Sequence, residues 1–500
     1  MRRSSFFAAV VVCCLLFGVA ALLLTPNSIS LAQAQTASAA TLKPVSAKMP
    51  ADIPSPRVAA PGTELYTAKR GESVHSVAHA YLGRTSYLTY SELTEAIRHA
   101  NGDFTSNFLK ANQTVVIPGI LPAPIVEKSI PVAKDFEVRA IYLTGVMAAS
   151  DHGISIIRHW REVGGNAVVF DIKDSDGSVN IPFDNPLLGK HNVYIHDLPK
   201  FMHFLHQQNM HAIARIAIFR DERIVTEHPE LAVQSRSQKQ PWRENGKLVW
   251  TDPSNPKVQE YDIALAKYVA QMGADEIQFD YVRFPAEGDQ KDTSFVFQKE
   301  HPNWQRSDVI ADFLKKAYGE IHPTGALLSL DVFGVMAWQR QVDLSHTGQD
   351  IVQMAKYSDV ISPMIYPSHF FGMDNIAHPG DAPEHFISES MDRFMLITKG
   401  SGVVIRPWLQ AFHWRTKTYS PDYIKIQVET ARKEGGIGFL FWNAANDYSK
   451  PYIAMPEMRA ADLKNLGKPP LYFRGDELPG VTRAALSAIS ASTEASGSNH

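Results

Sequence analysis

Two aspartates, Asp280 and Asp331, lie inside apolar segments of the sequence, where a charged side chain needs a physical reason. Asp280 belongs to EIQFDYVRFP at residues 276–285, and Asp331 belongs to ALLSLDVFG at residues 326–334. Two neighbouring carboxyl groups can act together in acid–base chemistry, one as a proton donor and the other as a nucleophile or base. The alternative for each is a structural carboxylate that pairs with an arginine of the same fold.

Side-chain alternation predicts which way these residues point if their segments are β-strands. The apolar residues Ile277, Phe279 and Tyr281 share one face of the first segment, a face suited to packing under helices. Gln278 and Asp280 then lie on the opposite face. The same alternation in the other strand-like segments predicts further inward-facing side chains: Asp171, Lys173, Arg215, Ser329, Asp331, Ser362, Met364, Tyr366, Arg406, Trp408, Gln410 and Asn443.

A site built from carboxylates, arginines, amides and aromatic rings suits sugar chemistry. Aromatic faces stack on pyranose rings, and charged or amide groups hold the sugar hydroxyls. Two carboxyl groups on either side of a glycosidic bond can hydrolyse it. We therefore predict Asp280 and Asp331 as the catalytic pair. The predicted substrate-binding residues are Asp171, Lys173, Arg215, Gln278, Arg283, Tyr366, His369, Arg406, Trp408, Gln410, Trp442 and Asn443.

These candidates need a scaffold that brings the ends of many strands together. Between residues 137 and 465, eight apolar strand-like runs alternate with stretches of helical period. The runs are VRAIYLTG, NAVVFDIK, HAIARIAIF, EIQFDYVRF, ALLSLDVFG, VISPMIYP, VIRPWLQAF and IGFLFWNA. This pattern predicts an α/β fold, a (β/α)8 TIM barrel, whose active sites lie at the carboxyl ends of the strands. A doubly wound open sheet is the alternative, but no GxGxxG motif follows the first strand.

The same region resembles a bacterial TIM-barrel family classed with the glycoside hydrolases. The resemblance covers about residues 138–448 and rests on seven motifs in a fixed order: NAVVFDIKDSDGSV, ARIAIFRD, DEIQFDYVRFP, DVFG, VISPMIYPSHF, RPWLQAF and FLFWNAAN. It implies a barrel that acts on polysaccharide.

A weaker similarity to family-18 chitinases bears on the mechanism. DEIQFDYVRFP can be laid over their fourth-strand signature, and the chitinase general-acid glutamate then falls on Val282. Valine cannot donate a proton, so the substrate-assisted chitinase mechanism is not supported. Asp280 remains as the carboxylate of this strand, in a role closer to nucleophile or base.

Residues 64–118 predict a small α+β unit with an opening strand, two helices and a closing strand, TVVIP. This order resembles a LysM domain. Asn112 stands where that family usually has glycine, and asparagine tolerates the left-handed backbone needed there. The resemblance implies binding of N-acetylglucosamine-containing glycans, above all peptidoglycan; the alternative is a docking module that no longer binds sugar. The matching pieces are Tyr66-Thr67, Arg70-Gly71-Glu72-Ser73, Ala100-Asn101 and Val116-Ile117-Pro118.

The N-terminal segment predicts export. Two arginines precede an unbroken apolar run from Phe6 to Leu24, typical of a signal peptide or a signal anchor over residues 1–34. Both cysteines, Cys13 and Cys14, lie in this run, so a processed chain would have no disulfide and no cysteine nucleophile. We expect a periplasmic, cell-envelope or extracellular protein, with membrane contact only if the segment is uncleaved.

Composition separates the remaining parts and excludes some partners. The predicted organisation is a flexible linker at 35–63, the LysM-like unit at 64–118, a second linker at 119–136, the barrel at 137–465 and a largely disordered tail at 466–500. A net charge of -3, from 49 basic and 52 acidic residues, gives no reason to expect nucleic acid as a partner. No H-E-x-x-H or paired-cysteine motif occurs, so we predict neither a metal nor a cofactor.

Three function hypotheses remain. The first is an exported glycoside hydrolase that acts on a cell-wall or extracellular polysaccharide and is held at peptidoglycan by its LysM-like unit. The second is a non-catalytic glycan-binding protein of the cell envelope. The third is a scaffold in envelope assembly, which would bind protein partners and no glycan.

Overall fold

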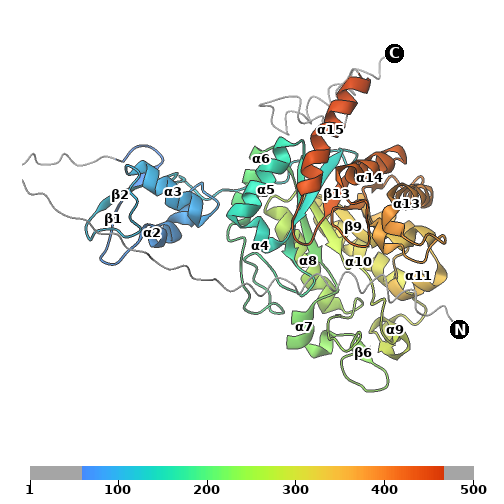
Figure 1. Cartoon of the computed structure of the whole chain (residues 1–500). Helices are drawn as coiled ribbons and strands as arrows, with labels where there is room; N and C mark the ends of the chain where they lie inside the picture. Colours follow the sequence, from blue (N-terminus) through green and yellow to red (C-terminus); the bar gives the residue numbers. More distant parts are fainter. Residues whose placement is uncertain (1–58, 467–500) are drawn as a thin grey trace, which may run out of the picture.

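The computed structural model describes residues 59–466 of the 500-residue chain. The predicted signal segment, most of the first linker and nearly all of the predicted tail lie outside these residues. A small unit and a large barrel make up the described chain, and Figure 1 shows the small unit beside the barrel, next to helices α5 (Asp151–Glu162) and α6 (Leu198–Gln207).

The large part is a closed barrel of parallel strands, as the eight apolar runs predict. Every neighbouring pair around the ring is parallel, and the last position pairs with the first. In order around the ring the strands are β3 (Val138–Leu143), β4 (Ala167–Lys173), β5 (His211–Ala217), β7 (Glu276–Asp280), β9 (Leu327–Phe333), β10 (Val360–Ile365), β11 (Val404–Ile405) with β12 (Trp408–Gln410), and β13 (Gly438–Trp442).

The seventh position of the barrel is split into two short strands. Pro407 lies in the gap between β11 and β12, and proline has no N–H to donate to a ladder. Its carbonyl still accepts a hydrogen bond from Leu440 N at 3.0 Å, so the ring stays closed across the gap.

Alternation along the strands separates two hydrophobic layers. Inward-facing residues such as Ala140, Val169, Ile213 and Leu440 form one cluster on the barrel axis. The outward-facing residues pack under the helices in a much larger cluster. Part of the barrel interior is therefore an apolar core.

The helices that cover the barrel begin at side-chain caps. Asp197, Asn255 and Ser420 each accept a hydrogen bond from the first turn of the helix that follows, and each of these helices has proline in its first turn. The helices are α4 (Gly145–Ala148), α5, α6, α7 (Glu222–Glu227), α8 (Pro256–Gln271), α9 (Phe297–Glu300), α10 (Arg306–Ile321), α11 (Gln341–Thr347), α12 (Ile351–Met354), α13 (Pro383–Ile397), α14 (Pro421–Lys433) and α15 (Ser449–Leu466).

A long insertion separates β5 from β7 and extends the carboxyl end of the barrel. It contains α7 and the two-residue strand β6 (Gln234–Ser235), which pairs in antiparallel fashion with β8 (Thr293–Ser294). Figure 1 shows α7, β6 and α9 gathered at the same end of the barrel.

The small unit has two antiparallel strands and two helices. Strand β1 (Thr63–Thr67) pairs with β2 (Thr114–Pro118), and α2 (Val74–Tyr81) and α3 (Tyr90–Ala100) lie between them in the sequence. The Asn101 side chain accepts from Val116 N at 2.8 Å and donates to Val116 O at 2.9 Å, which ties the end of α3 to β2. Asn112 has a φ of 65°, the left-handed conformation expected for it.

The small unit and the segment after it both contact the barrel. Lys200 of α6 donates to the carbonyl oxygens of Leu82 at 2.8 Å and Tyr87 at 3.3 Å. In the connecting segment, Ile130 N donates to Asp275 at 2.7 Å, and Glu127 lies 2.6 Å from His203 Nδ1. The predicted linker at 119–136 is thus bound along the barrel.

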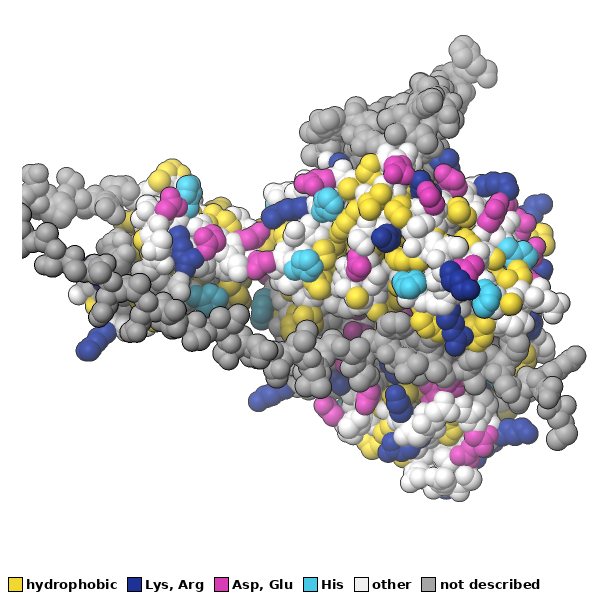
Figure 2. All heavy atoms as spheres, viewed as in Figure 1, with side chains coloured by type: hydrophobic (Ala, Val, Ile, Leu, Met, Phe, Trp, Pro, Cys, Tyr) yellow, Lys and Arg dark blue, Asp and Glu magenta, His cyan; other side chains and the backbone are white. Residues whose placement is uncertain are grey.

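The surface agrees with the balanced composition. Figure 2 shows acidic and basic side chains interspersed over the visible face of the barrel. Within residues 59–466, none of the helices combines the length and the apolar character that a membrane crossing requires.

Candidate active site

A cavity of about 360 Å³ opens at the carboxyl ends of the barrel strands. This is the end at which TIM-barrel enzymes place their active sites. The side chains that line it come from every strand position except β4 and from the loops that follow the strands. They are Tyr142, Thr144, Asp174, Ser175, Arg215, Arg220, Glu244, Trp250, Asp280, Tyr281, Arg283, Asp331, Phe333, Met364, Tyr366, His369, Trp408, Phe412, Trp442, Asn443, Ala444 and Ala445.

Arg215 of β5 organises the charges on the floor of this cavity. Its Nη2 donates to Asp280 Oδ2 at 2.6 Å, and its Nη1 donates to Asp171 Oδ1. Its Nε lies 3.9 Å from Asp331 Oδ2. One buried guanidinium therefore contacts three carboxyl groups, each from a different strand.

Asp280 ends strand β7 and opens towards the cavity. Its Oδ1 accepts a hydrogen bond from Tyr281 N at 2.6 Å, and its Oδ2 accepts from Arg215. Tyr281 has a φ of 53°, a left-handed conformation that is rare for a bulky residue and is found mostly where function constrains the backbone. This turn ends the strand immediately after the carboxylate.

Tyr281 corrects one of the sequence predictions. Alternation placed it on the outward face with Ile277 and Phe279, but it lines the cavity. The physical reason is the left-handed turn, which breaks the alternation one residue after Asp280. Val282, one residue further on, is fully buried in the outer hydrophobic cluster and is not among the lining residues.

Asp331 of β9 has a more enclosed environment. Its Oδ1 accepts a hydrogen bond from Trp408 Nε1 at 2.6 Å, and the residue is only 2% exposed. Burial, followed by the negative charge of Asp280, raises the pKa of the Asp331 carboxyl well above its usual range. The Arg215 charge and the Trp408 hydrogen bond oppose this shift without cancelling it.

Asp171 supports the site from behind the cavity wall. It is fully buried, and besides Arg215 it accepts a hydrogen bond from the hydroxyl of Tyr142 at 2.5 Å. Burial raises the pKa of Asp171 to about 7, against the opposing charge of Arg215. Asp171 is not among the lining residues, so it positions Arg215 and Tyr142 and does not face a ligand.

Aromatic rings form one wall of the cavity. Trp442 stacks on Tyr142 with ring centroids 4.2 Å apart and meets Trp408 edge-on at 5.9 Å. Sugar-binding sites combine flat apolar surfaces, which contact the ring, with charged groups, which bind the hydroxyls.

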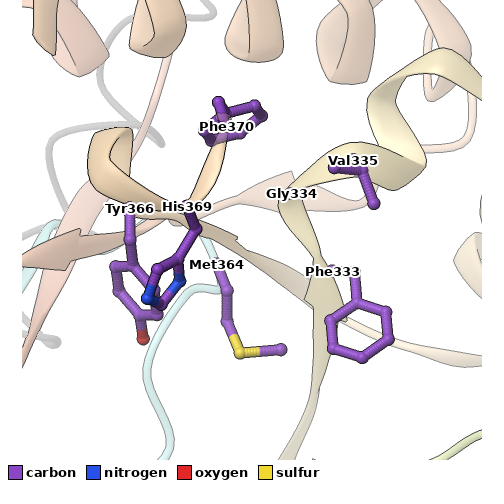
Figure 3. A pocket seen from close by; sticks show the side chains of 7 residues that line it. All are labelled: Phe333, Gly334, Val335, Met364, Tyr366, His369 and Phe370. Atoms are coloured by element: carbon purple, nitrogen blue, oxygen red, sulfur yellow. The ribbon is translucent and has the colours of Figure 1, made fainter. Parts of the chain in front are cut away.

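Tyr366 and His369 form the neighbouring wall, with centroids 5.2 Å apart. Figure 3 shows both rings on the same side of the chain as Met364, while Phe370 points the other way. They also line a small side pocket of about 20 Å³ with Phe333. Burial lowers the pKa of His369 to about 4, so its imidazole is neutral at neutral pH.

The insertion after β5 and the segment after β7 supply the remaining wall. Arg283 lies over the rings of Trp250 at 4.7 Å and Phe333 at 4.4 Å. Glu244 lines the cavity beside it. Burial and the charge of Glu244 raise the pKa of the adjacent Glu287 to about 7, while the Arg283 charge opposes the shift.

Most predicted site residues meet at this cavity. Of the fourteen, nine are among its lining residues: Arg215, Asp280, Arg283, Asp331, Tyr366, His369, Trp408, Trp442 and Asn443. The Asn443 amide is already bound to backbone, since it donates to Ala411 O at 2.7 Å and to Asp447 O at 2.8 Å. Asn443 therefore shapes the loop after β13.

Lys173 is the clearest correction. A β-bulge between Asp171 and Lys173 shifts the register of β4, and Lys173 turns away from the axis. Its Nζ lies 2.8 Å from Asp221 and 2.9 Å from Asp262 of α8, and all three side chains are buried. Lys173 holds a helix to the barrel.

Arg406 faces the axis as predicted but lies at the wrong depth for the site. Its Nη1 donates to both oxygens of Glu276, at 3.0 and 2.8 Å, at the amino-terminal end of β7. Gln278, one inward position below Asp280, is fully buried with its Nε2 3.4 Å from Ser362 Oγ. Gln410 bonds to the loop backbone, accepting from Ser368 N and donating to Phe412 O. None of the three lines the cavity. Arg406 and Gln278 lie too deep, because alternation gives the face of a strand and not the depth, whereas Gln410 is level with Trp442 but is bound to the loop backbone.

Sequence reasoning missed several lining residues. Tyr142 and Phe333 were within reach of the alternation argument, since each shares the inward face of its strand. Trp250, Glu244 and Arg220 come from the insertion after β5, which has no clear period and therefore no signal of direction. Within residues 59–466, no cluster of three or more histidine, cysteine, aspartate or glutamate side chains has the arrangement of a metal site.

Comparisons with known proteins place the barrel in a family. A family model described as "Putative glycosyl hydrolase domain" matches residues 140–448, more than half of the chain. A search of curated proteins found no match.

Three solved structures illustrate the structural comparisons. The first is a hypothetical protein from Ruminiclostridium thermocellum, 34% identical, covering 38% of this chain and 97% of that one, with a TM-score of 0.34. The second is the spore cortex-lytic enzyme SleL of Bacillus megaterium, 11% identical, covering 78% and 85%, with a TM-score of 0.38. The third is the glycoside hydrolase domain of PelA from Pseudomonas aeruginosa, 10% identical, covering 62% and 96%, with a TM-score of 0.37.

Proposed function

The chain belongs to the glycosyl hydrolase family whose model matches residues 140–448, and on that premise we propose that it is an exported enzyme that cleaves a cell-wall or extracellular polysaccharide. One observation carries the proposal: Asp280 and Asp331 line one cavity and contact the same guanidinium. Carboxyl groups that share a guanidinium are near enough to flank one glycosidic bond, for which glycosidases use separations of roughly 5 to 9.5 Å.

The two carboxyl groups have different environments, and this assigns their roles. Asp331 is enclosed, and burial followed by the charge of Asp280 raises the pKa of its carboxyl well above the usual range, which favours the protonated form. We therefore assign it as the acid that protonates the leaving oxygen. Asp280 accepts two hydrogen bonds, one from a cationic donor, and opens to the cavity, as a nucleophile or base requires. No cofactor takes part in this scheme.

The walls of the cavity would hold the sugar. Trp442, which is partly exposed and backed by Tyr142, offers ring surface for a pyranose, and Tyr366 and the neutral His369 can bond hydroxyl groups. Arg215 keeps both catalytic carboxyl groups in place. These contacts suit a polysaccharide chain better than a small charged metabolite, because apolar and aromatic surface makes up much of the lining.

The test is release of new reducing ends from purified glycans. Peptidoglycan, chitooligosaccharides and extracellular polysaccharides are incubated with the wild type and with Asp280→Asn. We expect the wild type to release reducing ends from one of these glycans and the variant to lose almost all of that release. Identical behaviour of both proteins on every glycan would refute the proposal.

We further propose that the small unit at residues 64–118 is a LysM-like module that binds N-acetylglucosamine-containing glycan. The element order, the Asn112 backbone and the quoted motifs support this assignment. Sedimentation with insoluble peptidoglycan tests it by comparing the full chain with a chain that lacks residues 59–120. Equal sedimentation of the two would contradict glycan binding by this unit.

Export rests on the N-terminal sequence, which has two arginines followed by the apolar run from Phe6 to Leu24. Cell fractionation with N-terminal sequencing of the mature protein tests it. A mature chain beginning near Gln35 in the envelope or the medium is the expected result. A cytoplasmic protein with an intact N-terminus would contradict export.

A non-catalytic glycan-binding protein is the second candidate. It is favoured by the ion pair between Arg215 and Asp280, because a structural carboxylate would make the same contact. Calorimetric binding of a glycan that the wild type leaves uncut, lost on Trp408→Ala, would support this reading over the first.

A further inference from the structure

Arg220, at the start of the insertion after β5, differs in its pairing from the other arginines that line the cavity. Arg215 contacts Asp171, Asp280 and Asp331. Arg283 lies close enough to Glu287 for its charge to lower the pKa of that carboxyl. Among the described residues, Arg220 has no aspartate or glutamate oxygen within the 4.0 Å of an ion pair, although it is only 8% exposed.

The structure holds the Arg220 guanidinium in a fixed position. Its Nη1 donates to the carbonyl oxygen of Ser175 at 2.5 Å, and the guanidinium lies 5.6 Å from the ring centre of Tyr281. Arg220 also faces Trp250 across an isolated antiparallel bridge. A planar guanidinium has five N–H donors, and only one protein hydrogen bond engages them here.

The remaining N–H donors of Arg220 indicate what this wall could bind. Arg220 lines the cavity, and burying a charge without a counter-charge is unfavourable, so a ligand that completes its hydrogen bonds is expected there. The complement of a fixed guanidinium is a carboxylate, which it can bind through two parallel hydrogen bonds.

The position of Arg220 fixes where that carboxylate would sit. Tyr281 contacts Arg220 through its ring and follows directly after Asp280. The group bound by Arg220 would therefore belong to the sugar at the cleavage site or to its neighbour. Glu244 and Asp174 also line the cavity, so the lining carries negative as well as positive charge and Arg220 is a local anion site within it.

We propose that Arg220 selects a glycan that carries a carboxylate on a sugar unit at or beside the cleaved bond. The inference rests on the proposed glycosidase function and names its substrate class. Two sources provide this chemistry, a hexuronic acid and the lactyl ether of muramic acid, and the two are separated by experiment.

The experiment compares matched pairs of glycans on the full chain. In the first pair, one glycan alternates N-acetylglucosamine with glucuronic acid, and the other is the same glycan with its carboxyl groups reduced to alcohols. The other pair contains muramic acid with the lactyl carboxyl free or reduced. Affinity is measured by calorimetry and cleavage by reducing ends, for the wild type, Arg220→Gln, Arg220→Lys and the exposed loop control Arg243→Gln.

We expect the wild type to bind one acidic glycan about 10- to 100-fold more tightly than its reduced partner, the range for hydrogen bonds to a charged group. The pair that shows the preference identifies the source of the carboxylate. Arg220→Gln should bring the ratio close to one, Arg220→Lys should keep part of it, and Arg243→Gln should keep all of it. Thermal unfolding of each variant shows whether it is folded.

The outcomes separate this inference from the proposed function. Cleavage with no preference in either pair, or a preference that survives in folded Arg220→Gln, overturns the role of Arg220 and leaves the hydrolase proposal standing. A preference that depends on Arg220 without release of reducing ends upholds the carboxylate site and counts against hydrolysis.

Discussion

At the scale of single residues, the arrangement around Arg215 separates two carboxyl groups that look alike in the sequence. Asp280 and Asp331 are both inward aspartates of neighbouring strands. One ends its strand at a strained turn and accepts two hydrogen bonds, while the other is enclosed beside Trp408. Different environments suit the same side chain to different roles, as acid–base catalysis requires.

The assignment of Asp331 as proton donor predicts a specific pH profile. A donor works only while it is protonated, so activity should fall as pH rises through its raised pKa. Asp331→Asn should lower kcat by about 10²- to 10⁴-fold and remove this alkaline limb. Initial rates across pH for the wild type and the variant measure both effects.

A substrate with an activated leaving group provides the control for Asp331. The dinitrophenolate of a dinitrophenyl glycoside departs without being protonated. Asp331→Asn should therefore lose much less activity on this substrate than on the natural linkage. The surface change Asp312→Asn should alter neither rate. Equal losses on both substrates would show that Asp331 does not act as the acid.

The buried pair of Glu276 and Arg406 predicts a pH dependence of stability. Burial opposes ionisation of Glu276, but the Arg406 charge and the His211 hydrogen bond outweigh it and lower the pKa from 4.5 to about 2. Because the folded pKa is depressed, the contribution is complete above pH 4.5 and is lost as pH falls through about 2. Glu276→Gln should therefore destabilise the fold by about 3 to 5 kcal/mol near neutrality.

Denaturant unfolding of the wild type and Glu276→Gln at several pH values measures this difference in the free energy of unfolding. The difference should shrink as pH approaches 2. Replacing both partners, as Glu276→Leu with Arg406→Met, should recover part of the loss because no buried charge is left unpaired. A difference that does not change with pH would contradict the ion pair.

The candidate site was predictable from the sequence only in part. The alternation of polar and apolar residues correctly gave the inward face of Asp280, Asp331 and Arg215. It could not give depth, and so Arg406 and Gln278 were assigned to the site although they lie below it. Depth depends on the stagger of neighbouring strands, which no single segment encodes.

At the scale of elements, small departures from regular strands decide which side chains reach the cavity. The bulge in β4 turns Lys173 outward, and the early end of β7 turns Tyr281 inward. The eight strand positions were predictable because each has its own apolar run. The bulge and the left-handed turn were not, because they arise from contacts with other elements.

Lys173 supplies the prediction at this scale. Lys173→Met leaves Asp221 and Asp262 without their buried counter-charge, so it should destabilise the fold by about 3 to 5 kcal/mol. Denaturant unfolding measures the loss, with the surface change Lys267→Met as the control. If glycan affinity of the folded variant fell while stability did not, Lys173 would belong to the site after all.

At the scale of the whole molecule, the small unit is bound to the barrel and not merely tethered to it. Lys200 is only 4% exposed and bonds two backbone carbonyls of the small unit, and Arg158 of α5 lies 3.1 Å from Glu92 of α3. The barrel class and the small unit were both readable from periodicity. The contact between them could not be predicted from the sequence. It depends on backbone carbonyl groups, which every residue has.

Lys200→Ala should loosen this contact. It removes the Lys200 ammonium from the carbonyls of Leu82 and Tyr87, although Leu82 keeps its hydrogen bonds from Thr85, so we expect faster proteolysis within residues 119–136 and an earlier, separate thermal transition for the small unit. Limited proteolysis and calorimetry measure these effects, and Lys257→Ala, on an exposed position of α8, is the matched control. An unchanged digestion pattern would show that the contact contributes little.

The aromatic wall has a practical consequence. Three of the eight tryptophans in the chain, Trp250, Trp408 and Trp442, line the cavity, and two of them meet edge to face. Trp250 and Trp408 are each 1% exposed, while Trp442 is partly exposed, so a sugar that stacks on Trp442 would displace water from its indole ring and change the wavelength and intensity of its emission. The protein thus has an intrinsic optical reporter of occupancy, and fluorescence titration can screen unlabelled glycans before any cleavage is known.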